Sequence, residues 1–399
     1  MESWFLMGQG RSDGAEQLGG RSLTDLRDHN QAAVLDCLVT ATQPVTIRRL
    51  QELTGLTRPT VSAAMNSLLE QGDALEQESM HAGGRGGRRS RMFTLNATKR
   101  VQAGAAIRLQ DVELGLADWH GEMLISTSRP LRGGSPGALL DEALDDLLQE
   151  LGLDSVDTMV IGALGSVGPD GRLRHNESLP EISDPDHFTA LHDGRVGNVM
   201  IENDAVLAAL AEQHVRGLAD TESMVSLLID ASVGAGIILD GRAIRGSAGY
   251  AGEMSYLPGA GWATAHLDLV DAAARHDVSA EALFELAGSP HAPVWAEQAV
   301  DAFADAIVPG VAALLAALDP GLLVIGGHAR PAHVRIARRL RASLRDDLPH
   351  LPCIEASRAG AHAVVQGAVS LRWHSRRPRL DKSERGSDGV PKEILTTLA

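Results

Sequence analysis

Residues 101 to 375 alternate between strand-like and helix-like spacing of apolar side chains, and this alternation restricts the fold more than any other feature. It predicts an α/β body with two similar halves, each made of three strands followed by a helix. Aromatic residues make up only 3% of the chain, so aliphatic side chains must fill the core. The predicted strands are Val101–Ala106, Glu113–Asp118, Met123–Thr127, Thr158–Leu164, Val199–Glu202, Met224–Asp230, Gly236–Leu239 and Leu322–Ile325, and the predicted helices are Leu139–Leu151, Ala205–Val215 and His333–Leu344.

The segment before this body has the pattern of a helix-turn-helix. Thr46 is a good N-cap for a helix over Ile47–Thr54, which Gly55 would end. Thr57 is the expected N-cap of the next helix, Arg58–Glu70. The side chains expected to face inward are Leu50, Leu53, Val61, Ala64 or Met65, Leu68 and Leu69.

The outer face of the helix over Arg58–Glu70 carries short polar groups and one arginine, which suit base edges and phosphates in a major groove. A glycine- and arginine-rich run, Gly83–Arg91, follows between two short strand-like segments and predicts a β-hairpin wing. Its arginines would contact the DNA backbone or minor groove. The predicted DNA-contacting residues are Thr57, Arg58, Thr60, Ser62, Asn66, Arg85, Arg88 and Arg89, with Ser67 on the same helical face and Arg91 at the end of the wing.

The charge distribution agrees with this division. Residues 1–100 hold 12 Lys and Arg against 11 Asp and Glu, although the whole chain has a net charge of −16. Within them, His81–Arg100 has six basic residues and no acidic one. A locally basic head on an acidic body suggests a DNA-binding module joined to a sensing or oligomerising domain.

Other classes of protein are disfavoured by the composition. The two cysteines, Cys37 and Cys353, cannot form a disulfide framework or a cysteine-rich zinc site. The longest uncharged apolar run, Ala306–Leu318, has 13 residues, and the N-terminus lacks the pattern of a signal peptide, so we expect a cytoplasmic protein without a membrane partner. The expected domains are a disordered 1–20, a winged helix-turn-helix over 21–98, the body over 101–375 and a disordered tail over 376–399.

Five segments of the body resemble the ROK family, which comprises repressors and sugar kinases of the actin-like ATPase fold. The head resembles the winged helix of ROK repressors in the order Asn30, Gly55-Leu56-Thr57, Arg58–Glu70, Gly83–Arg91. The resemblance covers roughly residues 21–375. The five segments are Gly104–Glu122, Val160–Pro180, Ile201–Gly217, Val233–Tyr256 and Asp319–Gly327.

The departures from the kinase pattern lie in the nucleotide loops. Ala106–Gln110 stands where ROK kinases have Asp-Ile-Gly-Gly-Thr, and Asp230–Gly234 stands where they have Gly-Thr-Gly-Val-Gly. Gly326-Gly327-His328 replaces a third glycine run. A carboxylate at Asp230 would repel polyphosphate, and side chains replace glycines where backbone amides should approach it. We therefore expect no kinase activity and no nucleotide cofactor.

The sugar-contacting residues of the family pattern are retained more fully than its nucleotide loops. The resemblance implies that Asn203, Asp204 and Glu253 contact sugar hydroxyls, with Ser178 and Tyr256 at two further contact positions where the family has Asn and His. The family's zinc site cannot form, because no cysteine-rich segment follows Tyr256. Alternatively, Asn203-Asp204 only caps the helix from Ala205.

These patterns predict a DNA-binding transcriptional regulator, a repressor, whose body senses a sugar or a related small ligand. A homodimer or tetramer would present two heads to a palindromic operator in double-stranded DNA. Two alternatives stay open: an ATP-dependent sugar kinase with an accessory DNA-binding head, and a DNA-binding protein whose body serves only for assembly.

Overall fold

The structure is a computed structural model that describes residues 23–41, 43–78, 91–99, 101–176, 179–218, 222–230, 232–345 and 348–370. The chain divides into two compact units, Met1–Asn96 and Ala97–Ala399. Each unit has its own hydrophobic core.

The first unit is a three-helix domain with a small antiparallel sheet in the strand order β1-β3-β2. β3 pairs with β2 along its length, and β1 joins its other edge. This is the topology of a winged helix. The elements are α1 (Leu23–Thr40), β1 (Val45–Thr46), α2 (Ile47–Thr54), α3 (Arg58–Glu70), β2 (Ala74–Glu78) and β3 (Arg91–Leu95).

Local sequence signals set the helix ends, and the predicted bounds of α2 and α3 are confirmed. The Thr46 hydroxyl accepts the Arg49 amide at 3.2 Å, and Gly55 ends α2 with φ +70°. Thr57 takes the N-cap position of α3 without capping it, because its hydroxyl instead bonds the Thr60 hydroxyl at 2.8 Å.

The core of the first unit differs from the sequence prediction at two leucines. Leu53 is 48% exposed, because it lies on the outer side of α2, whereas Leu50 is fully buried. Leu69 is only half-buried. The sequence pattern left open whether Ala64 or Met65 faces inward, and both side chains are buried. The buried side chains are Val34, Leu38, Val45, Leu50, Val61, Ala64, Met65, Leu68, Ala74, Phe93 and Leu95.

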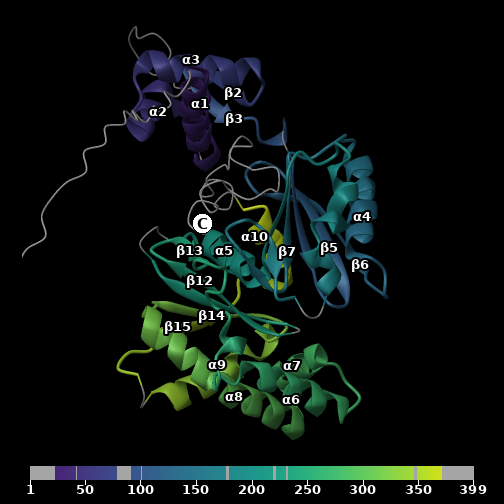
Figure 1. Ribbon diagram of the computed structural model, residues 1–399. Coiled ribbons are helices and arrows are strands. Elements are labelled where there is room, and N and C mark those ends of the chain that lie inside the picture. Colours follow the sequence, from purple (N-terminus) through teal and green to yellow (C-terminus); the bar gives the residue numbers. More distant parts are fainter. Residues whose placement is uncertain are drawn as a thin grey trace, which may run out of the picture. The chain divides into compact units, whose positions relative to one another are not determined.

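The second unit contains two five-stranded mixed sheets, which define its two lobes (Figure 1). In the first lobe the order is β10-β7-β4-β5-β6, with β10, β7 and β4 parallel. Helix α4 (Pro136–Leu151) packs on β5 and β6. The strands are β4 (Gln102–Ile107), β5 (Asp111–Ala117), β6 (Met123–Pro130), β7 (Thr158–Ala163) and β10 (Val199–Asn203).

The second lobe repeats this plan with the order β13-β12-β11-β14-β15, in which β11, β14 and β15 are parallel. Its helices surround one apolar core in which Trp262 and Phe284 are almost fully buried. The elements are β11 (Met224–Ile229), β12 (Val233–Leu239), β13 (Arg242–Ile244), α6 (Trp262–Ala274), α7 (Ala280–Gly288), α8 (Val294–Leu318), β14 (Leu322–Gly327), α9 (His333–Leu344) and β15 (Cys353–Ala356).

Two helices, α5 (Asp204–Arg216) and α10 (Ala363–Ala368), join the lobes. They pack on each other, α5 against β11 and β12 and α10 against β4 and β7. The contact is close at Gly367, where a Cβ atom would come within 1.9 Å of the Leu207 carbonyl oxygen. A side chain at Gly367 would therefore push the lobes apart.

After β7 the glycine-rich segment Gly165–Gly171 contributes to a short hairpin. β8 (Ser166–Val167) pairs with β9 (Leu173–Arg174). Arg174 pairs with Asp170 at 2.6 Å across it. This hairpin lies just beyond β7 and brings residue 175 back toward the strand ends.

Helix α8 is long and apolar enough to cross a membrane by length and composition alone. Its inward residues, including Val300, Phe303, Ala304 and Ile307, are buried in the core of the second lobe. The core helix of a water-soluble protein passes the same test, so this is weak grounds for a membrane span.

Candidate functional site

The exposed face of α3 carries the residues predicted to contact DNA. The Arg58 and Asn66 side chains are exposed, and Thr60 and Ser62 are half-buried beside them. Thr57 is exposed and is held against Thr60 by their hydroxyl–hydroxyl bond. The helix therefore presents one cation and several hydrogen-bonding groups to solvent, as base readout in a groove requires.

Ser67 does not belong to this face. Its hydroxyl donates to Gln31 Oε1 on α1 at 3.0 Å and accepts from Gln71 at 3.3 Å. The pair Ser67–Gln31 fixes α3 against α1, which is a packing role that helical spacing alone did not reveal.

The wing strands β2 and β3 are present in antiparallel register, with Glu78 opposite Arg91. Arg91 makes two hydrogen bonds to the Glu76 carboxylate, at 2.5 and 2.6 Å, so this arginine is engaged within the wing rather than offered to phosphate. The predicted contacts Arg85, Arg88 and Arg89 lie outside the described residues.

In the second unit the polar residues of interest follow the carboxyl ends of parallel strands. Arg108 follows β4, Gly165 lies just beyond β7, Asp204 follows β10, Asp230 follows β11 and His328 follows β14. In open α/β sheets this edge is where ligands bind.

Asn203 ties three segments together at this edge. Its Oδ1 accepts the Val206 amide at 2.9 Å and so caps α5, which agrees with the capping alternative. Its Nδ2 also donates to the Gly165 carbonyl at 3.0 Å and to Glu253 Oε1 at 3.3 Å. Because the amide reaches Glu253 from the second lobe, Asn203 does more than cap a helix.

Three carboxylates converge near this amide. Burial raises the pKa of Asp204 to about 7, with the charges of Asp230 and Glu253 adding to the shift and the Ala205 amide opposing it. Burial also raises the pKa of Glu253. With a pKa of about 7, the Asp204 carboxyl group can both accept and donate hydrogen bonds at neutral pH, as recognition of a polyol requires. Ser178 lies outside the described residues, and Tyr256 is exposed.

Asp230 is the residue that the family resemblance aligns with a glycine of ROK kinases. Its Oδ1 accepts the His328 amide at 2.8 Å, which joins the ends of β11 and β14. A Cβ atom at Gly327 would come within 2.4 Å of this oxygen, so the contact is tight. The carboxylate thus holds the ends of these two strands together.

His328 and His266 lie beside this contact. His328 Nδ1 is 3.7 Å from Asp230 Oδ1. The pKa of His266 is lowered by burial and by His328, against the attraction of Asp230. Within the described part of the chain, His266 Nδ1 is buried without a hydrogen-bond partner.

Arg108, in the loop that follows β4, is held by contacts within the protein. It pairs with Glu113 and, at 3.2 Å, with Asp111. Burial lowers the pKa of Arg108, but the Glu113 bond and the nearby acids outweigh it and the net shift is upward. Glu113 also bonds His362, just before α10, so this loop is fastened to the helix that joins the lobes.

Three aromatic rings cluster beside Glu253. The His175 ring centroid lies 5.1 Å from that of Tyr250 and 6.1 Å from that of Tyr256, and the two tyrosine rings are 6.0 Å apart. Of these three residues, only Tyr256 is among those that the sequence predicts to contact the ligand. The available signal was that both tyrosines of the chain fall within seven residues.

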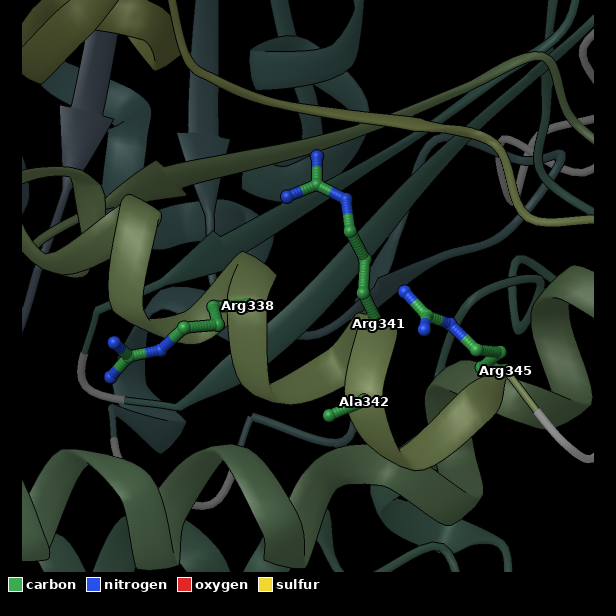
Figure 2. Close-up of a pocket in the computed structure, with 4 residues that line it drawn as sticks. All are labelled: Arg338, Arg341, Ala342 and Arg345. Atoms are coloured by element: carbon green, nitrogen blue, oxygen red, sulfur yellow. The ribbon is translucent and has the colours of Figure 1, made fainter.

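Figure 2 shows a hollow of about 540 Å³ on the outer face of α9, lined by Arg338, Arg341, Ala342 and Arg345. Arg341 donates to the Ile354 carbonyl at 2.9 Å. The Arg338 side chain points away from those of Arg341 and Arg345, so the guanidinium groups do not converge on one position. None of the residues that the sequence predicts to contact DNA or a ligand lines this hollow. Among the described residues there is also no group of three metal-ligating side chains.

Sequence profiles identify both units. The ROK family profile matches residues 105–260, and an IclR helix-turn-helix profile matches residues 31–78. The chain therefore contains a ROK family domain and an IclR-type helix-turn-helix.

The chain spans about half the length of two curated repressors that it matches and about a third of one curated enzyme. The xylose repressor of Bacillus subtilis is 24% identical over 223 residues, which cover 54% of this chain and 56% of the repressor. A putative xylose repressor from Caldicellulosiruptor sp. is 24% identical over 52% of this chain and 53% of its own length. The bifunctional enzyme NanE/NanK of Brucella suis is 31% identical over 43% of this chain and 34% of the enzyme.

Solved structures confirm the fold. A ROK family transcriptional regulator, described as a homologue of the E. coli MLC protein, superposes with a TM-score of 0.67 at 19% identity. The match covers 87% of this chain and 96% of the regulator. A ROK glucokinase from Streptomyces griseus has a TM-score of 0.54 at 19% identity over 67% of this chain and 98% of its own. The architecture is a winged helix-turn-helix followed by a two-lobed actin-like body.

Proposed function

We propose that this protein is a sequence-specific DNA-binding repressor whose ROK body binds a sugar or a related small ligand. The observation that carries the proposal is the pairing of an exposed recognition helix with a body that keeps the sugar-side groups. Asn203 contacts Glu253, and Asp204 lies next to it, whereas Asp230 stands where a kinase needs glycine. Relatives named xylose repressor support the same assignment.

In this proposal α3 lies in the major groove, with Thr57, Arg58, Thr60, Ser62 and Asn66 toward base edges. Arg85, Arg88 and Arg89 of the wing contact phosphates or the minor groove. The body over 101–375 assembles a cytoplasmic homodimer or tetramer, so that two heads over 21–98 bind a palindromic operator whose half-sites are about one helical turn, or a multiple of it, apart.

The ligand acts through the body. Asn203, Asp204 and Glu253 bind its hydroxyl groups, with Ser178 and Tyr256 completing the site. The ligand changes operator affinity only by binding two states of the body with different affinity. Asn203 of the first lobe bonds Glu253 of the second lobe. A ligand bound at these two residues therefore affects the contact between the lobes.

One observation favours a kinase: a pKa of about 7 suits Asp204 to act as a general base. Phosphoryl transfer also needs the nucleotide phosphates to be positioned and neutralised. Asp230 and the internally paired Arg108 do not provide this. We therefore propose that the protein is not an enzyme and needs no cofactor.

Selection of DNA fragments by the purified full-length protein tests the proposal. We expect an enriched palindromic motif, and an Arg58→Ala variant should lose affinity for it. The absence of any enriched sequence, with and without sugars, would contradict the proposal.

A coupled ATPase assay with a sugar panel tests the kinase alternative. If no sugar raises the melting temperature, the body serves assembly only.

A further inference from the structure

The aromatic cluster beside Asn203, Asp204 and Glu253 contains tyrosine, a residue type that is rare in this chain. The protein has only two tyrosines, and Tyr250 and Tyr256 are both in the cluster, 38% and 53% exposed. His175 is exposed as well. Large rings left in contact with water in a protein so poor in aromatic residues are not needed to build its core.

The cluster is fixed to the candidate sugar site through the backbone. Glu253 donates its amide to the Tyr250 carbonyl at 3.2 Å, and Tyr256 donates its amide to the Glu253 carbonyl at 3.3 Å. The two tyrosines therefore stand on either side of the carboxylate that contacts Asn203. A ligand held by Glu253 lies within reach of the rings.

His175 comes from the other lobe. It follows the β8–β9 hairpin, which packs closely on the tyrosine loop, since a Cβ atom at Gly249 would lie 2.2 Å from the Val167 carbonyl oxygen. Its backbone has φ +55°, a conformation that residues other than glycine rarely adopt. Strain of this kind persists where the surrounding structure holds a side chain in a particular place.

The chemistry of the site changes from its inner to its outer part. Asn203 is buried, and Asp204 and Glu253 are half-buried, so they suit the hydroxyl groups of one sugar ring. The aromatic rings are exposed and offer flat faces with negative electrostatic potential. The C–H bonds on one face of a pyranose are polarised by the neighbouring oxygens and pack well on such a ring face.

We propose that His175, Tyr250 and Tyr256 form an outer aromatic subsite that packs against the C–H face of a second pyranose, so that the effector is a neutral glycoside of at least two rings. This inference rests on the proposed sugar-sensing function. It specifies the minimum size of the ligand, and it adds two residues, His175 and Tyr250, to the proposed ligand-binding site.

Isothermal titration of the full-length protein with matched sugars tests the subsite. The probes are glucose with cellobiose and maltose, and xylose with xylobiose. We expect one disaccharide to bind at least about tenfold tighter than its own monosaccharide, the gain that one or two aromatic contacts provide. Equal affinity for the two sizes would overturn the subsite and leave the sugar-sensing function standing. Failure of every sugar to bind would instead overturn sugar sensing itself.

Variants separate the two parts of the site. Tyr250→Ala should reduce disaccharide affinity to the monosaccharide level, while Tyr250→Phe keeps it. Glu253→Gln should weaken both sizes of ligand. His175→Asn removes a ring at a position where asparagine tolerates positive φ. Leu267→Ala, at a leucine 63% exposed outside the cluster, is the matched control and should change nothing. Equal losses for both ligand sizes in Tyr250→Ala would contradict the proposal.

Discussion

Asp204 should make the stability of the protein fall as the pH rises toward neutrality. Burial raises the pKa of its carboxyl group from 3.8 to about 7 in the folded protein. Between these two values the folded protein holds a proton that the unfolded chain has released. The free energy of unfolding therefore decreases with increasing pH throughout this window, and the Asp204 contribution is lost above pH 7.

The size of the effect follows from the two pKa values. One pKa unit corresponds to about 1.4 kcal/mol, and the folded-state shift spans roughly three units. Between pH 5 and pH 8 Asp204 should lower the free energy of unfolding by up to about 2.5 kcal/mol. Asp204→Asn cannot ionise, so this part of the pH dependence should disappear from the variant.

Urea denaturation at several values between pH 5 and pH 8 measures the difference between wild type and Asp204→Asn. The comparison removes the contributions of the other titrating groups, which both proteins share. Asp277→Asn is the matched control, because Asp277 is exposed and its positive φ of +54° suits asparagine equally. Parallel pH profiles for wild type and Asp204→Asn would refute the reasoning.

Three further predictions concern the DNA-binding head and the interior of the body. Arg58→Ala should weaken operator binding by about 1–3 kcal/mol in a gel-shift titration if it makes a bidentate base contact, and unchanged affinity would exclude that role. Arg88→Ala with Arg89→Ala should weaken specific and non-specific DNA alike and reduce the salt slope by about 2, whereas a change in sequence preference alone would make the wing a base reader. Glu212→Ala should destabilise the body by about 3 kcal/mol in denaturant titrations, because buried Glu212 pairs with Arg216 and accepts two further hydrogen bonds; an unaffected midpoint would contradict this.

Features that depend on a few neighbouring residues could be read from the sequence. The ends of α2 and α3 follow from Thr46, Gly55 and the recognition-helix pattern, and the Asn203 cap of α5 follows from an Asn-Asp pair before an apolar helix. Leu53 was misassigned because helical spacing gives a face but not which neighbour covers it. In a short helix such as α2, only the side chains that neighbouring elements contact are buried.

The sequence by itself determined the α/β alternation and the wing strands, because these depend on local periodicity and on residue type. Only the tertiary structure decided which residues distant in sequence contact each other. Asp230 bonds an amide 98 residues away, and Glu113 meets His362 across 249 residues. His175 reaches the two tyrosines from the opposite lobe. No local pattern encodes such contacts, because they arise only when the parallel strands place their carboxyl ends at one edge and the two lobes close on each other.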